Sequence, residues 1–170
     1  MTASPLGPEF CDPFYVSRES LIDLARKIEL DVHTQQGWGF PPVMFAVELR
    51  GRDGYTANFV ARCVAGFAPG GGSERDPVTA VMSMAELVAH YVEGRVRQPT
   101  PVVPYAPYAW VVALEYRATR LVVLSTAHGE TIAVSRQRAS DEVGATTPPK
   151  PMVVALQALV QVAVPKQGLN

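Results

Sequence analysis

The chain has 170 residues, of which 48% are hydrophobic and 18% charged, and its formal net charge at pH 7 is −1. This length is enough to bury one substantial core, and the hydrophobic share excludes an intrinsically disordered chain. A net charge near zero supplies no global positive field for phosphate backbones or acidic membranes, so nucleic acid is not an expected partner.

The cysteines and the chain ends bear on the cellular compartment. Cys11 and Cys63 allow at most one disulfide, and the N-terminus lacks the basic, apolar and cleavage regions of a signal peptide. The longest apolar run, Met152 to Pro165, is interrupted by glutamines and is shorter than the roughly 20 residues that a membrane span needs. We therefore expect a cytoplasmic protein with no membrane partner.

The distribution of prolines predicts the domain limits. The N-terminal residues contain Pro5, Pro8 and Pro13 without apolar periodicity, which is typical of an arm. We predict a flexible arm over residues 1–16, a single domain over 17–164 and a C-terminal tail over 165–170.

The first half of this domain begins with a helix. Apolar residues recur at helical spacing after Ser17, which predicts a helix over about residues 18–34, with Ser17 or Ser20 as its N-cap and Gly37 at its end. Two prolines then favour extended backbone. The apolar face of the predicted helix consists of Leu21, Leu24, Ala25, Ile28 and Val32.

A hairpin and a second helix are expected next. Residues 43–49 and 55–64 have strand composition, and 51–54 have turn composition. After a glycine-rich loop, Asp76 can cap a helix that starts with Pro77 and ends near Gly94. A start at Ser83 is the alternative.

The second half is predicted to be a meander. Residues 98–107 form a proline-rich crossover, and three β-rich runs follow over 108–116, 119–126 and 130–138. Residues 141–151 have loop composition. The apolar segment 152–164 has helical spacing, and its valine content leaves a strand as the alternative.

These elements predict an α+β fold, in the order α-β-β-α-β-β-β-α, with a mainly antiparallel sheet and helices packed on it. Roadblock-like and profilin-like domains share this order by analogy, and a shared fold does not transfer a function.

No cofactor or metal site is expected. The run Gly70 to Gly72 lacks the lysine of a phosphate-binding loop, so we interpret it as a flexible loop. His33, His90 and His128 stand too far apart in sequence for a recognisable metal motif.

No catalytic residue is assigned either. The chain lacks a Gly-x-Ser-x-Gly nucleophile elbow, and Cys63 in a β-rich run is interpreted as a buried structural thiol. If the protein were a hydrolase, Glu115, His128 and Cys63 would be the candidate groups.

Five residues are candidates for a ligand or partner surface. Glu115 is a single carboxylate in an otherwise apolar strand, and Arg136 and Arg138 share strand parity and therefore one face. Trp38 and Trp110 offer large aromatic surfaces.

The segment from Gly37 to Ala46, with the helix before it, resembles a small actinobacterial and actinophage family of unknown function that carries Gly-Trp-x-x-Pro-Pro before a strand. The similarity extends to Asp76-Pro77 and to the strand from Trp110 to Glu115. Family members commonly have Asp-Gln where this chain has Gly39-Phe40, so a polar role of those positions is absent. The resemblance implies a bacterial or phage accessory protein and supplies no catalytic residue.

The composition favours a non-enzymatic interaction, assembly or regulatory protein that forms a homodimer, or binds another protein, through a sheet edge or an apolar helix face. The first alternative is a small-molecule or nucleotide-binding domain lined by Trp38, Trp110 or Tyr108, with Gly70 to Gly72 as its lid. The second alternative is a small hydrolase.

Overall fold

The computed structural model describes residues 16–39, 41–53, 56–66, 77–92 and 107–163. In these residues three helices and six strands follow the order α-β-β-α-β-β-β-β-α, and the strands form one antiparallel sheet with helices packed on it. The predicted α+β class and the mainly antiparallel sheet are thereby confirmed.

Helix α1 (Arg18–Gln36) is the helix expected from the apolar spacing. The Oγ of Ser17 accepts a hydrogen bond from the Ser20 backbone N–H at 3.2 Å, so Ser17 is the N-cap. Gly37 ends the helix with φ of 65°, a conformation that favours glycine, and donates its N–H to the His33 carbonyl at 2.9 Å. Val16, inside the predicted arm, is buried in the core beneath α1.

The sheet runs in the order β2-β1-β3-β4-β5-β6, and every neighbouring pair is antiparallel. The chain therefore forms a hairpin and a four-stranded meander, which join where β1 pairs with β3. The strands are β1 (Val43–Asp53), β2 (Thr56–Gly66), β3 (Ala109–Tyr116), β4 (Thr119–Thr126), β5 (Thr131–Gln137) and β6 (Val143–Thr146).

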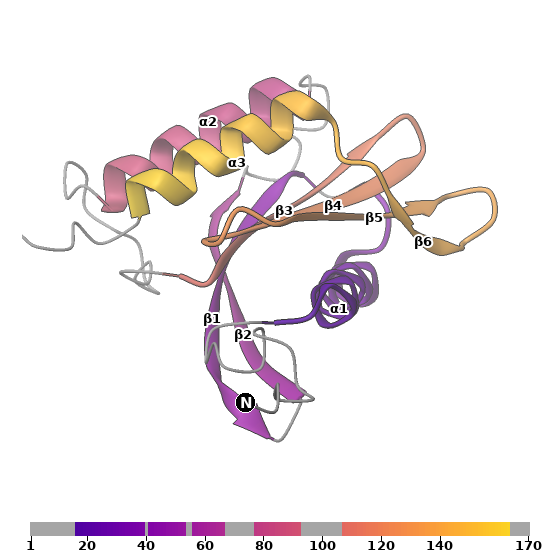
Figure 1. Ribbon diagram of the computed structural model, residues 1–170. Coiled ribbons are helices and arrows are strands. Elements are labelled where there is room, and N and C mark those ends of the chain that lie inside the picture. The colour runs from indigo at the N-terminus through magenta and orange to yellow at the C-terminus, as the bar shows by residue number, and fades with distance from the viewer. Residues whose placement is uncertain (1–15, 40, 54–55, 67–76, 93–106, 164–170) are drawn as a thin grey trace, which may run out of the picture.

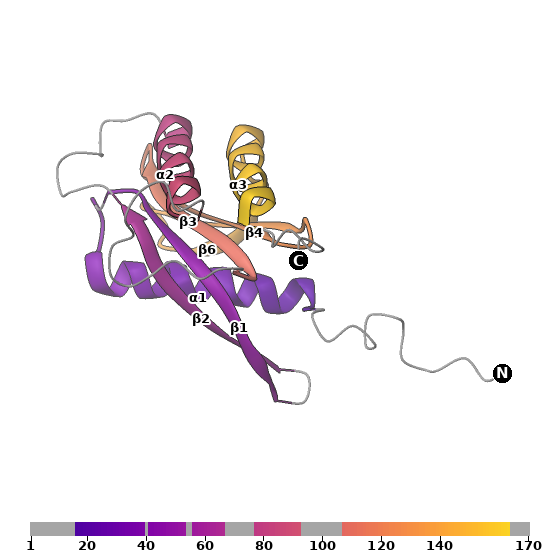
Figure 2. The ribbon, with the colours of Figure 1, turned by 90° about the vertical axis from the view of Figure 1, so that its left-hand side faces the viewer.

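Helices cover both faces of this sheet. Figure 1 shows α1 on one face and α2 (Pro77–Val92) with α3 (Lys150–Ala163) on the other, and Figure 2 shows α2 and α3 side by side. The central strand β3 is buried on both sides, which explains its nearly continuous apolar sequence. Alternate residues of β3 enter different cores: Val111 packs toward α1, and Trp110 and Val112 pack toward α2 and α3.

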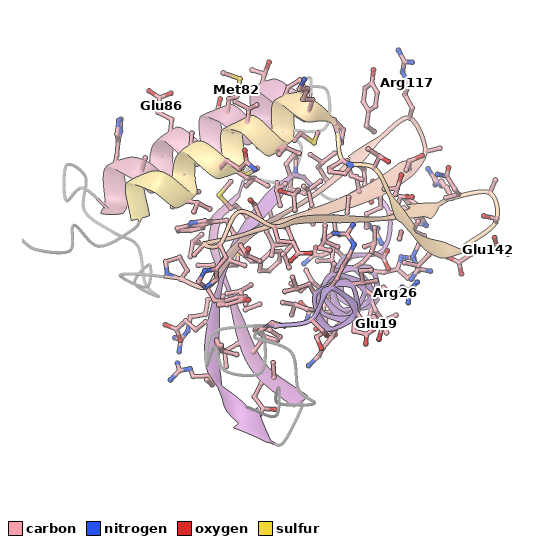
Figure 3. All side chains as sticks on the ribbon, viewed as in Figure 1. Glu19, Arg26, Met82, Glu86, Arg117 and Glu142 are labelled. Atoms are coloured by element: carbon pink, nitrogen blue, oxygen red, sulfur yellow. The ribbon has the colours of Figure 1, made fainter. Side chains whose placement is uncertain are left out.

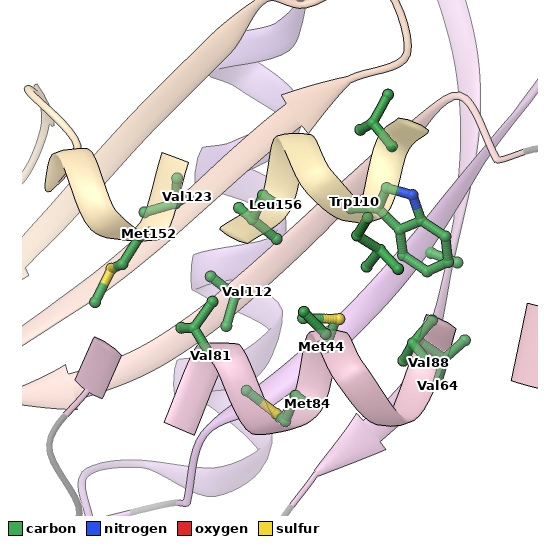
Figure 4. Close-up of a cluster of buried hydrophobic side chains, with 14 of the residues drawn as sticks. Met44, Val64, Val81, Met84, Val88, Trp110, Val112, Val123, Met152 and Leu156 are labelled. Carbon is green, nitrogen blue, oxygen red and sulfur yellow. The ribbon is translucent and has the colours of Figure 1, made fainter. Parts of the chain in front are cut away.

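The core beneath α2 and α3 is assembled from distant parts of the chain (Figure 4). Met44 of β1, Trp110 of β3 and Leu156 of α3 are each at most 1% exposed. Burial of side chains from five strands and two helices in one cluster ties the hairpin to the meander.

The β1–β2 hairpin extends beyond the rest of the sheet and passes beside α1 (Figure 1). Its register shifts between Met44 and Phe45 and again between Leu49 and Gly51. Such irregularities bend a strand and increase its twist, and Gly51 has a φ of 148° that a side chain would disfavour. The half of β2 nearest the hairpin turn, which includes Ala57 to Phe59, lies next to α1.

The last third of the chain differs from prediction in one element. The expected loop over residues 141–151 contains the short strand β6, whose four residues pair with Ala133 to Arg136 of β5. Its sequence, Val-Gly-Ala-Thr, combines two residues that are common in strands with two that are depleted from them, so pairing with β5 decides its conformation. The helical interpretation of 152–164 is confirmed by α3.

Several predicted features lie outside the described residues: the arm over 1–15, the loop with Gly70 to Gly72, Asp76, most of the 98–107 crossover and the tail over 165–170. The helix start at Pro77 rather than Ser83 is confirmed. In the described part of the chain, no helix combines the length and apolar character needed to cross a lipid bilayer.

Candidate functional site

A cluster of charged side chains is buried between α1 and the sheet, where α1 ends. Glu29 of α1 and Arg120 of β4 are each 0% exposed, and Arg136 of β5 is 7% exposed. Arg120 and Arg136 are cross-strand partners, so both guanidinium groups reach the same helix face.

Glu29 and Arg136 form a bidentate ion pair. Arg136 donates from Nε to Glu29 Oε1 at 2.6 Å and from Nη2 to Glu29 Oε2 at 2.8 Å. Its Nη1 donates to Asp141 Oδ1 at 2.7 Å. The hydrogen bond to Glu29 is the main cause that raises the pKa of Arg136 above its ordinary value, against the opposing effect of desolvation.

Arg120 uses both terminal nitrogens. Nη1 donates to Glu29 Oε1 at 3.1 Å and to His33 Nδ1 at 2.8 Å, and Nη2 donates to Glu115 Oε1 at 2.8 Å and to the Gly37 carbonyl. Because arginine only donates, His33 accepts at Nδ1, which places the proton of the neutral ring on Nε2. That nitrogen lies 4.0 Å from Asp141 Oδ1.

Trp38 covers this cluster. The Cζ atoms of Arg120 and Arg138 lie 4.6 and 5.7 Å from the centre of its ring, and His33 meets it edge-on at 6.1 Å. The N–H of Gly39 donates to Glu115 Oε2 at 2.8 Å. The glycine-tryptophan segment after α1 is thus attached to the sheet through Arg120 and Glu115.

The structure brings four of the five predicted surface residues together. Trp38, Glu115, Arg136 and Arg138 all belong to the cluster or contact it, whereas Trp110 lies on the opposite face of the sheet and is 1% exposed. Trp38 and Trp110 therefore do not line one site.

Sequence reasoning did not select the two residues at the centre, Glu29 and Arg120. A signal existed for Glu29, which lies four residues after Ala25 and next to Ile28 on the apolar face of α1, where a carboxylate needs a partner. Arg120 has the same strand parity as the apolar residues Val122 and Leu124 of the α1-facing core.

The cluster's chemistry is structural. Its carboxylates accept from guanidinium groups of the same cluster, so their charges are compensated internally. In the described part of the chain, no group of three or more His, Cys, Asp and Glu side chains is arranged to hold a metal ion.

The three hydrolase candidates lie apart. Glu115 stands near the β3–β4 turn, and His128 stands in the β4–β5 turn at the other end of β4, where its ring lies 5.9 Å from that of Tyr108. Cys63 is on the outermost strand, β2, where its side chain is exposed, so the prediction of a buried thiol is wrong. The fold does not assemble them into one site.

A second feature is an apolar groove of about 370 Å³ on the outer side of the α2–α3 pair. Met82 and Val154 beside it are 57% and 59% exposed, and Leu87 of α2 is 38% exposed. Figure 3 shows Met82 and Glu86 pointing away from the sheet. The lining residues are Met82, Ala85, Glu86, Ala89, Pro151, Val154, Ala155, Ala158 and Leu159.

The outer surfaces of the two helical layers differ in charge. Helix α1 carries seven Lys, Arg, Asp and Glu residues, and Figure 3 shows Glu19 and Arg26 pointing away from the sheet. In α2 and α3 together, Glu86 and Lys150 are the only residues of these four types. The surface of α1 is suited to water, and that of α2 and α3 is suited to apolar contact.

Asp141 makes the stability of the cluster pH-dependent. The hydrogen bond from Arg136 lowers the pKa of Asp141 below 3.8, its ordinary value, so the ionised carboxylate stabilises the fold. That contribution is complete above the pKa of the unfolded chain and is lost as the pH falls through the lower pKa of the folded chain. We expect Asp141→Asn to be less stable than the wild type at pH 7 and to approach it below pH 4 in urea unfolding. Ser140→Ala is the control: neither residue titrates, so its difference in stability from the wild type should be the same at every pH. A pH-independent loss of stability in Asp141→Asn would contradict this account.

Comparison with known protein families, with curated proteins and with solved structures gives no match to this chain. The family resemblance and the analogy to roadblock-like and profilin-like domains therefore stay predictions.

Proposed function

We propose that the protein is a non-enzymatic interaction module that self-associates through the outer face of α2 and α3. The observation that carries this proposal is the apolar groove between the two helices, with Met82 and Val154 exposed beside it. Its biological role would be that of an assembly or regulatory accessory protein of an actinobacterium or its phage, as the Gly37 to Pro42 segment suggests.

Burial of this face would be favourable. Full burial of a methionine, leucine or valine side chain contributes about 1.5–3 kcal/mol, and Met82, Leu87 and Val154 are each more than one-third exposed. The helices are about 24 and 21 Å long at 1.5 Å per residue, so two such pairs can pack as a four-helix layer.

A second copy of this chain is the occupant that the charges favour. Glu86 and Lys150 have opposite signs, so the face has no net charge and two copies of it do not repel each other. A twofold dimer also needs only one self-complementary patch, which this face supplies.

A small-molecule site is the second candidate. The groove volume of about 370 Å³ falls within the range of ligand pockets, roughly 300–1,000 Å³, and its lining is almost wholly apolar. An apolar ligand held between α2 and α3 would explain the same exposed side chains. Native mass spectrometry of the purified protein distinguishes the two, because a ligand adds mass to a monomer and self-association multiplies the mass of the chain.

The test of self-association is the double variant Met82→Glu/Val154→Glu. Two buried carboxylates per copy without partners should raise the dimer dissociation constant by at least about 100-fold, which size-exclusion chromatography with light scattering would detect as a monomer. Leu30→Glu is the matched control, because Leu30 is 54% exposed on α1, and this variant should remain a dimer. A wild-type monomer, or a double variant that stays dimeric, would refute the proposal.

A further inference from the structure

Strand β2 is an edge strand of the sheet in the described part of the chain. It is the outermost strand in the sheet order, spans 11 residues, and pairs only with β1 in the described part of the chain. An edge of this length without proline presents backbone donors and acceptors that another strand can bind.

The direction of these backbone groups follows from one hydrogen bond. The Val47 carbonyl accepts from the Tyr108 N–H at 2.7 Å and therefore points toward β3. Because N–H and C=O groups alternate in direction along a strand, the neighbours of Val47 point toward β2, where they pair with Val60 and Arg62. Ala61, between these two, consequently directs its N–H and C=O outward.

A groove runs along the part of this edge nearest the hairpin turn. It measures about 310 Å³ and lies between α1 and β2, with Leu24 of α1 and Phe59 of β2 among its lining. Asp23 and Lys27 stand one helical turn apart in it and are exposed. The remaining lining residues are Ser20, Ala57 and Asn58.

The α1-facing side chains of β2 leave room for an incoming chain. Phe59, Ala61 and Cys63 pair with Leu49, Val47 and Phe45, which all belong to the core on the α1 face. None of the three is charged, and Ala61 and Cys63 are exposed. Small uncharged side chains beside a helix permit close approach of a further strand.

We propose that the β2 edge beside α1 binds an extended segment of a partner protein, which adds to the sheet as an edge strand. The segment would pair with the outward N–H and C=O of Ala61, place an apolar side chain between Leu24 and Phe59, and contact Asp23 and Lys27 with polar side chains. This site is on the α1 face, away from the α2–α3 groove, and does not depend on self-association there.

An extended segment of a partner protein fits this edge better than a second copy of the chain or the residues before α1. A second copy pairing through its own β2 would bring its α1 to the same side of the joined sheet, where the first α1 already borders the groove. The residues before α1 include Pro5, Pro8 and Pro13, at odd and even positions, so a strand built from them would lack donors on both of its edges.

The test starts with selection of a displayed library of random linear peptides, about 12 residues long, on the full chain. An enriched peptide is synthesised with a fluorescent label, and its affinity is measured by anisotropy. Ala61→Pro removes the outward N–H and leaves the β1 pairing of Val60 and Arg62 in place, so we expect affinity to fall at least about tenfold. Ala61→Ser keeps the N–H and should bind like the wild type, as should Met82→Glu/Val154→Glu.

Peptide variants make the test independent of how well Ala61→Pro folds. Two versions of the peptide are N-methylated at every second residue, one at the odd and one at the even positions. One version should lose binding and the other should keep it, because only alternate N–H groups face β2. The proposal is overturned if no peptide is enriched. It is also overturned if the peptide affinity is unchanged by Ala61→Pro and by N-methylation in either register. A disulfide-linked dimer of Ala61→Cys in a Cys11→Ser/Cys63→Ser background would assign the edge to a second copy and also overturn it.

Discussion

Replacement of Glu29 by glutamine is expected to destabilise the protein by about 3–5 kcal/mol. The carboxylate accepts three hydrogen bonds from Arg120 and Arg136, and both guanidinium groups are almost completely buried. The amide would leave two buried cations without their shared counter-ion.

Urea unfolding followed by circular dichroism measures this effect. Glu19→Gln, an exposed change on the same helix, is the control and should alter the free energy of unfolding by less than about 0.5 kcal/mol. A loss below about 1 kcal/mol in Glu29→Gln would show that water compensates the two arginines.

Substitution of Trp110 by alanine is expected to cost about 3–5 kcal/mol, since the indole is 1% exposed in the core beneath α2 and α3. Trp110→Phe keeps an aromatic ring in the cavity and should lose much less. The loss should appear in thermal and urea unfolding alike, with no separate unfolding step if the two cores unfold together.

Tryptophan fluorescence provides a direct measurement. In a Trp38→Phe background Trp110 is the remaining indole, and its emission should shift to longer wavelength only on unfolding, as expected for a buried ring. Loss of partner binding in Trp110→Ala without loss of stability would contradict this assignment and would return Trp110 to the candidate surface.

The two faces of the sheet are held by different interactions, and this difference bears on function. The α1 face joins helix to sheet by an apolar core and, in addition, by ion pairs around Glu29, and leaves a charged outer surface. The α2–α3 face is held by apolar packing and leaves an apolar outer surface. A protein that associates through α2 and α3 keeps α1 fixed by contacts that do not involve the interface.

Much of the fold followed from local chemistry in the sequence. Ser17 and Gly37 delimit α1 because a hydroxyl caps a helix start and glycine tolerates positive φ at a helix end. The β-rich runs of the meander and Pro77 at the start of α2 were likewise recognisable, since residue type alone favours these conformations.

Tertiary structure alone decided the rest. Strand β6 exists because β5 offers it a pairing edge, since its four residues, two that favour strands and two that do not, leave the conformation undecided. The two tryptophans lie on opposite sides of the sheet, and this placement depends on how the elements pack. Trp38 lies against Arg120 and Arg138, whereas Trp110 lies in the core beneath α2 and α3. Glu29, Arg120 and Arg136 are separated by up to 107 positions, and only packing of α1 across β4 and β5 makes their burial favourable, because each charge then finds its counter-ion.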